Sequence, residues 1–244
     1  MKSLAVKAGW VALVIPVALV VVAVGCGGGG GDEQATQTPS GPHINITTVT
    51  AAPLSTSLPP RTGDFASLCQ KSSKKRFAAP QTVIDPSRSY TATIRTEKGD
   101  ITIELFPDIA PVTVNSFVFL ACSGFYDGVT FHRVIPNSSP FVAQAGDPTG
   151  TGSGNPGYHV PDEFNSQPFD RGTVGMANTG APNSGGSQFF ICYVAQPNLN
   201  GGYTVFGKVT AGMDVVDKLT PRDPSTDPNA PPGDKILEIT VQEH

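Results

Sequence analysis

Alternating apolar and polar positions predict a β-hairpin at the start of the folded part of the chain. The runs TATIRT and ITIELF lie on either side of residues 98–100, and each places an apolar side chain at every second position. A helical pattern follows, with apolar residues at 114, 117, 118 and 121. Pro111 stands where the first helical position would be and Gly124 follows the last, so we expect a helix over 110–123.

The remaining apolar runs are short and are separated by loops rich in Gly, Pro and Asn. They cover 129–135, 172–178, 187–194, 203–209 and 235–242, and a second helical pattern covers 211–219. Short strands with two isolated helices favour a mostly β fold, a closed antiparallel β-barrel capped by two α-helices, because closure leaves no strand edge exposed.

A long apolar segment near the N-terminus is typical of a signal peptide rather than of the fold. Lys2 and Lys7 precede an apolar run over 8–24, and the sequence AVGC ends at Cys26. Small residues before a Cys resemble the lipobox of bacterial lipoproteins, although Ala23 stands where Leu is usual. We therefore expect residues 1–26 to be a signal peptide, Cys26 to be lipidated, and the protein to be exported and anchored at the outer face of the bacterial cell membrane. An uncleaved signal anchor is the alternative.

Composition divides the rest of the chain into three parts. Residues 27–64 are rich in Gly, Thr, Ser and Pro and predict a disordered tether. Residues 65–89 contain Phe65, Leu68 and Phe77, and we expect this extension to pack on the domain that follows it over 90–244.

The charges argue against nucleic acid as a partner. Formal net charge is −4 and only 15% of residues are charged. The densest basic stretch, Lys71 to Arg76, contains four cations, which is too short to follow a phosphate backbone.

Export makes a disulfide possible. With Cys26 lipidated, three cysteines remain, namely Cys69, Cys122 and Cys192, so at most one bridge forms and one thiol stays free. The sequence leaves the pairing open; we favour Cys69–Cys122, which would join the extension to the domain.

Several short motifs point to chemistry that their surroundings do not support. Residues 152–157 match GxGxxG, but Pro156 falls where the dinucleotide-binding helix would begin. Residues 180–187 have phosphate-loop spacing, but Gly186 replaces the essential Lys. The four His residues lie too far apart for a zinc site. No nucleophile stands beside a base, so we expect no covalent catalysis. With the motifs above set aside, we also expect no metal and no cofactor.

Three longer segments carry a family resemblance. FHRVIP…FVAQAGD (131–147), GMANTGAPNSGGSQFFI (175–191) and LNGGYTVFGKV (199–209) occur in this order. Together they resemble the cyclophilins, the peptidyl-prolyl cis–trans isomerases, over about residues 90–244. The resemblance implies an eight-stranded antiparallel barrel capped by two helices. It also implies an enzyme that accelerates rotation of X–Pro bonds, with proline-containing segments of exported proteins as its partners.

The resemblance assigns a role to ten residues of this sequence. Arg133 matches the catalytic arginine of the family. Tyr203 stands where eukaryotic members often have His, and Thr179 where Ala is frequent. The positions that match the substrate groove are Phe141, Gln144, Ala177, Asn178, Thr179, Gln188, Phe190, Leu199 and Tyr203.

The sequence departs from the family pattern at the rim of the groove. Four residues, 137–140, stand between FHRVIP and Phe141 where one is usual, which is a three-residue insertion (Ser138–Pro140). We expect Phe141 still to reach the pocket. The insertion leaves open an alternative function, a surface-displayed module that binds proline segments with little turnover. Asn198 replaces the Trp of family members that bind cyclosporin tightly, so we expect weak cyclosporin binding.

Overall fold

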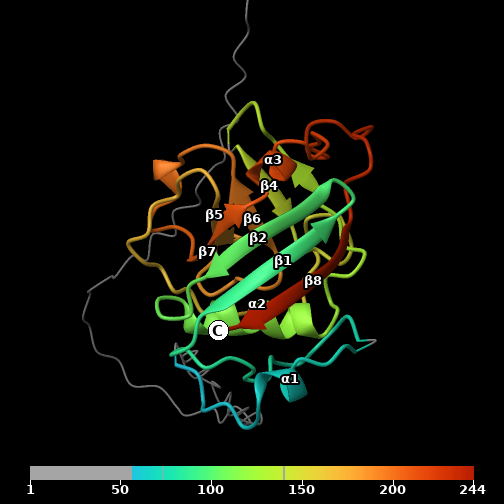
Figure 1. Ribbon diagram of the computed structural model, residues 1–244. Helices are drawn as coiled ribbons and strands as arrows, with labels where there is room; N and C mark the ends of the chain where they lie inside the picture. The colour runs from blue at the N-terminus through green and yellow to red at the C-terminus, as the bar shows by residue number, and fades with distance from the viewer. Residues whose placement is uncertain (1–56, 73, 140) are drawn as a thin grey trace, which may run out of the picture. The chain divides into compact units, whose positions relative to one another are not determined.

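A computed structural model of the chain describes residues 57–72, 74–139 and 141–244. The predicted signal peptide with Cys26, the tether residues 27–56, and Pro140 lie outside these described residues. Within the described part, eight strands form one sheet with the order β3-β4-β6-β5-β7-β2-β1-β8, and all seven pairings are antiparallel. Figure 1 shows β2, β1 and β8 in front of β4, β5 and β6. The strands are β1 (Tyr90–Thr96), β2 (Gly99–Leu105), β3 (Arg133–Val134), β4 (Val142–Ala145), β5 (Thr173–Met176), β6 (Phe189–Cys192), β7 (Val205–Ala211) and β8 (Ile236–Glu243).

The predicted hairpin is confirmed as β1 and β2. Ile94 pairs with Ile101 across it, and both side chains are fully buried. Thr96 closes the turn, since its Oγ1 accepts the Lys98 N–H at 3.0 Å and donates to the carbonyl oxygen of Gly99 at 2.7 Å. The alternation read from the sequence is therefore the inward and outward alternation of the strands.

The sheet is open at one edge, which corrects the prediction of a closed barrel. The edge strands are β3 and β8, and among the described residues the gap beside them is spanned by isolated bridges, such as Thr130↔Lys235 and Val134↔Arg222. Strand β3 has only two residues. The segment before β8, residues 221–233, contains five prolines, which have no backbone N–H to donate. A continuous ladder cannot form along this edge, so the sheet curls without closing.

The predicted first helix is confirmed as α2 (Pro111–Cys122), and a residue distant in sequence caps its N-terminus. Ala110, at the N-cap, has no side-chain acceptor. The carboxylate of Glu163 instead accepts the N–H of Val112 at 3.0 Å and of Thr113 at 2.7 Å. These bonds satisfy two of the free N–H groups at the helix start and fix the loop around residue 163 on the helix.

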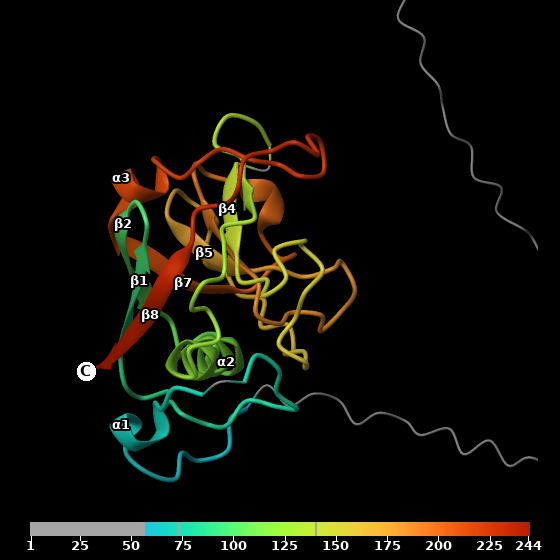
Figure 2. The ribbon, with the colours of Figure 1, turned by 90° about the vertical axis from the view of Figure 1, so that its right-hand side faces the viewer.

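Helix α2 is buried on both sides because the N-terminal extension covers the side that faces away from the sheet. Figure 2 shows α2 end-on between the sheet and the segment that carries α1 (Phe65–Leu68). Asn115 Oδ1 accepts the N–H of Val83 at 2.8 Å and of Ile84 at 3.3 Å. The buried amide of Asn115 thus finds its partners in the extension.

A disulfide joins the extension to the end of α2. The structure pairs Cys69 with Cys122, which is the pairing that the sequence favoured, and Cys192 is the free thiol of the described residues. With a sequence separation of 53 between the two cysteines, the chain-entropy account of a cross-link gives about 4 kcal/mol of stabilisation. Next to it, Lys75 Nζ donates to the carbonyl oxygen of Gly124 at 2.7 Å.

The domain begins before residue 64, the end of the predicted tether. Leu58 packs against the cluster that contains Tyr158 and Val160. Arg61 Nη1 lies 2.5 Å from the Glu243 carboxylate in a half-buried ion pair. Because these two side chains find partners on the domain, residues 57–64 belong to the extension.

The second helix is shorter than predicted. Strand β7 continues to Ala211, and Gly212 follows with φ 87°, a conformation that glycine adopts without strain. Helix α3 then covers only Met213–Val216, and the remaining short helix is the 3-10 turn η1 (Pro197–Leu199). Within the part of the chain that the structure describes, no helix has the length and apolar character needed to cross a membrane.

Candidate active site

The pairing of three strands brings Arg133, Gln144 and Phe190 into one row. Arg133 of β3 is opposite Gln144 of β4, and Gln144 is opposite Phe190 of β6. Residues directly opposite each other in antiparallel strands point to the same side of the sheet. The row continues to Gly175 of β5, which is opposite Phe190. Residues from four separate strands thus form one surface.

Phe190 forms the apolar floor of this surface. Its ring stacks on Phe169 with 5.6 Å between centroids and meets Tyr203 edge-on at 5.4 Å. Gly175 is required beneath the ring, because a Cβ there would lie 2.6 Å from both Phe190 and Phe169. Three aromatic rings and a glycine therefore hold one another in place.

A cavity of about 180 Å³ lies over this floor. Arg133 and Gln144 supply polar groups on one side, and the remaining wall is largely apolar. It is lined by Arg133, Val142, Gln144, Ala177, Asn178, Phe190, Leu199 and Tyr203. Seven of the ten residues predicted from the sequence are therefore brought together in one pocket.

Phe141 does not line this pocket, and its place in the substrate groove stays a prediction. Its φ is 49°, its N–H donates to the Ser138 carbonyl at 2.7 Å, and its side chain packs against the main core. Val142 lines the pocket instead. Strand residues two positions apart point to the same face, so Val142 and Gln144 of β4 share the face that lines the pocket. The two-residue spacing of Val142 and Gln144 is visible in the sequence.

The pairing of Arg133 with Gln144 is present on either side of the predicted insertion Ser138–Pro140, of which Pro140 lies outside the described residues. Arg133 and Gln144, which precede and follow it, remain paired across β3 and β4.

A second cavity of about 320 Å³ adjoins the first and shares Gln144, Ala177 and Asn178 with it. Two predicted residues, Thr179 and Gln188, lie here rather than in the smaller pocket. Its far wall is the loop 152–155 together with His159. A peptide that entered the first cavity would extend into the second.

Two glutamines connect the pocket to this loop. Gln188 Nε2 donates to the carbonyl oxygens of Gly152 and Gly154, both at 2.9 Å. Gln188 Oε1 accepts a hydrogen bond from Gln144 Nε2, also at 2.9 Å. Because the Gln144 amide nitrogen is used in this way, its oxygen is the atom that can accept a bond from a ligand.

Asp147 fixes the same loop from beneath. Its side chain is almost fully buried, and it accepts bonds from Thr149 N–H and Oγ1, both at 2.7 Å, and from Gly152 N–H at 2.6 Å. Burial alone would raise the pKa of Asp147, but the bonds from Thr149, Gly154 and Gly152 outweigh it and hold the pKa below the usual 3.8. Asp147 is therefore ionised at neutral pH.

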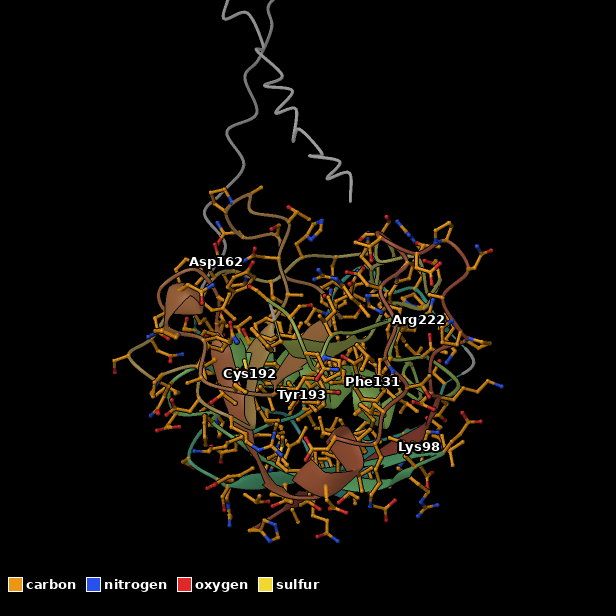
Figure 3. All side chains as sticks on the ribbon, turned by 90° about the horizontal axis from the view of Figure 1, so that it is seen from above. Lys98, Phe131, Asp162, Cys192, Tyr193 and Arg222 are labelled. Atoms are coloured by element: carbon orange, nitrogen blue, oxygen red, sulfur yellow. A yellow bond between two sulfur atoms is a disulfide. The ribbon has the colours of Figure 1, made fainter. Side chains whose placement is uncertain are left out.

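Arg133 is the charged group of the pocket. Its side chain is 33% exposed, and its Nε lies 3.5 Å from Asp223 Oδ1. Burial lowers the pKa of His132, whose two ring nitrogens have no partner among the described residues, and burial raises the pKa of the Cys192 thiol to about 12. Figure 3 labels Cys192 in the interior of the domain.

Sequence reasoning missed three contributors to the site. Val142 follows from the strand period, as described above. Phe169 and Asp223 come from loops far from the residues they contact, and nothing in the local sequence around either marks it as part of the pocket.

Comparisons with known proteins show which family the chain belongs to. The family described as "Cyclophilin type peptidyl-prolyl cis-trans isomerase/CLD" matches residues 91–241. A peptidyl-prolyl cis-trans isomerase of Synechococcus elongatus is 53% identical over 152 residues, which cover 62% of this chain and 94% of that protein. Peptidyl-prolyl cis-trans isomerase B of Bacillus subtilis is 50% identical over 122 residues, 49% of this chain and 82% of that protein.

Solved structures show the same fold. The crystal structure of a Cryptosporidium parvum cyclophilin type peptidyl-prolyl cis-trans isomerase aligns with a TM-score of 0.58 at 36% identity, covering 64% of this chain and 99% of that one. The same isomerase in the presence of the dipeptide Ala-Pro aligns with a TM-score of 0.57, covering 63% and 99%. The family match begins after the extension and the N-terminal segment.

The carboxylate of Asp147 should stabilise the domain in a pH-dependent way. We expect Asp147→Asn to lower the free energy of unfolding by about 1–3 kcal/mol at neutral pH. The NH₂ group of the asparagine side chain would face a backbone N–H that now donates to the carboxylate, and one hydrogen bond would be lost. The folded pKa is below 3.8, so the wild-type advantage is present above that value and disappears as the pH falls through the folded pKa. Urea denaturation of the wild type and of Asp147→Asn at pH 7 and at about pH 3 measures the stability difference at each pH. Equal stabilities of the two proteins at pH 7 would contradict the role of this carboxylate.

Proposed function

We propose that this chain, which belongs to the cyclophilin-type peptidyl-prolyl cis-trans isomerases, uses the Arg133 pocket to rotate X–Pro bonds in exported proteins. The isomerase activity itself follows from the family. The observation that carries the assignment to this pocket is the row Arg133, Gln144 and Phe190, which lines a small cavity with both polar and apolar walls.

The reaction needs a site that stabilises a twisted amide and no nucleophile. Amide resonance opposes rotation of the peptide bond with a barrier of about 18–20 kcal/mol, and uncatalysed X–Pro isomerisation takes on the order of tens to hundreds of seconds. In the twisted state the prolyl nitrogen becomes pyramidal and gains a lone pair. A site that binds this state better than either planar isomer accelerates the rotation.

Arg133 is the group that would favour the twisted state. A guanidinium remains charged at all working pH values and donates several N–H bonds in a fixed plane. Directed at the prolyl nitrogen or the preceding carbonyl, these donors stabilise charge that the planar amide lacks. The half-exposed position of Arg133 at the mouth of the cavity allows this contact.

The rest of the pocket would hold the peptide while one side of the bond turns. Val142, Phe190 and Leu199 offer an apolar seat for the pyrrolidine ring, and Gln144 Oε1 and the Asn178 backbone offer hydrogen bonds to the peptide. The relative that was crystallised in the presence of Ala-Pro supports a proline-containing peptide as the ligand.

Arg133→Ala should abolish most of the catalysis without unfolding the domain. We expect kcat/KM on an Ala-Pro peptide to fall by about tenfold or more, because the donor acts mainly in the transition state. Arg95→Ala, which removes an outward-facing arginine of β1, is the matched control and should keep normal turnover. A protease-coupled assay with a thermal melt of each variant decides the point; near-normal turnover in Arg133→Ala would refute its role.

Asn198 should make cyclosporin a weak inhibitor. Asn198 is exposed in η1 beside Leu199, where tightly binding family members have Trp. Inhibition of isomerase activity should appear only well above nanomolar concentrations of cyclosporin, and Asn198→Trp should strengthen it by supplying aromatic contact area. A nanomolar inhibition constant for the wild type would show that the absent Trp is not limiting.

We further propose that the enzyme is exported and held at the outer face of the membrane by a lipid on Cys26. The AVGC sequence after the apolar segment supports this, and so does the Cys69–Cys122 disulfide, because such bonds persist in oxidising compartments. Folding of exported proteins close to the membrane would then be its setting.

Cys26→Ser tests the anchor in a bacterial host. The wild-type full chain should incorporate radiolabelled palmitate and be recovered with membranes, whereas Cys26→Ser should incorporate none. Membrane recovery of an unlabelled wild-type chain would support the uncleaved signal anchor and contradict lipidation.

A further inference from the structure

We propose that Asp223 is a positioning residue for Arg133: its carboxylate holds the guanidinium at Nε and leaves the terminal nitrogens directed at the substrate amide. The proposal rests on the proposed catalytic role of Arg133. Asp223 lies in the segment 221–233, which makes an isolated bridge to β3 at the open edge of the sheet.

Backbone hydrogen bonds place Asp223 beside Arg133. Val134 and Arg222 exchange two of them, Val134 N–H to the Arg222 carbonyl at 2.8 Å and Arg222 N–H to the Val134 carbonyl at 2.9 Å. Arg133 precedes Val134 and Asp223 follows Arg222, which makes the two charged residues neighbours across an antiparallel bridge. The fixed backbone therefore limits how far the two side chains can separate.

The contact is an ion pair made through one atom of the guanidinium. Arg133 Nε lies 3.5 Å from Asp223 Oδ1, which is longer than a direct hydrogen bond. A guanidinium has five N–H donors, of which one is on Nε and four are on the terminal nitrogens. Gln144 flanks Arg133 on its other side, across β3 and β4. The carboxylate thus lies on the side of Arg133 away from Gln144, and the terminal donors remain available to the pocket.

Asp223 is itself held before any substrate arrives. Its Oδ1 accepts the Ser225 hydroxyl at 2.6 Å and the Ser225 N–H at 3.2 Å, and its carbonyl oxygen accepts the N–H of Asp227 at 2.9 Å. Its side chain is only 17% exposed. Burial would raise the pKa of Asp223, but the Ser225 bonds and the Arg133 charge outweigh it and lower the pKa, so the carboxylate is ionised at neutral pH.

Two arginines, Arg133 and Arg222, lie close to Asp223, and its carboxylate supplies a negative charge between them. Arg222 is adjacent to Asp223, and the charges of both Arg222 and Arg133 contribute to lowering the pKa of nearby His132. Asp147, the other acid near this histidine, is occupied by the loop at 149–152. Figure 3 labels Arg222 and Phe131 on the side of the domain away from Asp162. Asp223 is the carboxylate that lies within ion-pair distance of Arg133 among the described residues.

Three variants of the full chain test the proposal. Asp223→Ala removes the carboxylate, and Asp223→Asn keeps an oxygen for the Ser225 bonds but removes the charge. Asp227→Asn is the control, because it makes the same charge change in the same loop and Asp227 bonds to Asn229 rather than to Arg133. We expect kcat on an Ala-Pro peptide to fall by roughly three- to tenfold in both Asp223 variants, with KM and the melting temperature nearly unchanged. Asp227→Asn should match the wild type.

A double-mutant cycle with Arg133→Lys shows whether Asp223 acts through the guanidinium. Lys has neither Nε nor a planar fork to orient, so Asp223→Asn should cause little further loss in that background. Multiplicative losses, or a normal kcat in Asp223→Asn, would overturn the inference. Failure of the proposed function is distinct, since it appears as normal turnover in Arg133→Ala whatever Asp223 does.

Discussion

Antiparallel pairing of β4 with β3 on one side and with β6 on the other places Arg133, Gln144 and Phe190 on one face of the sheet. A shift of one residue in either pairing would turn a member of this row toward the opposite face. Strand β3 is only two residues long, so its own hydrogen bonds are few. The exchange of bonds between Val134 and Arg222 adds support from the other side and makes the 221–233 segment part of the site.

The loop that forms one wall of the neighbouring cavity is held by residues behind it, and some of these lie outside the residues that the family model matches. Asp147 and Gln188 hold the loop at 152–154 from the sheet side. From outside the matched residues, Phe77 donates its N–H to the Pro156 carbonyl at 2.7 Å, so the extension bonds directly to the continuation of that loop. The disulfide and the buried polar groups of α2 fix the extension in turn. The extension is thereby part of the support of the substrate groove.

Sequence reasoning predicted those features that depend on local spacing or on long motifs. The hairpin and α2 follow from their periodicities, and Arg133, Gln144 and Phe190 follow from motif matches. The open edge was not predicted, because it depends on how many ladder bonds a proline-rich segment can make with a two-residue strand. Phe141 packs against the main core and is absent from the lining of the Arg133 cavity, so its contact with substrate stays a prediction. Phe169 and Asp223 reach the site only through tertiary contacts.

A crystal structure of the described domain bound to an Ala-Pro peptide tests the central claim most directly. The account predicts the pyrrolidine ring against Phe190 and Leu199, with a terminal nitrogen of Arg133 within about 3 Å of the prolyl nitrogen or of the preceding carbonyl oxygen. Gln144 Oε1 should accept a hydrogen bond from the peptide. A proline ring bound outside this pocket, with Arg133 making no contact to the peptide, would contradict the account.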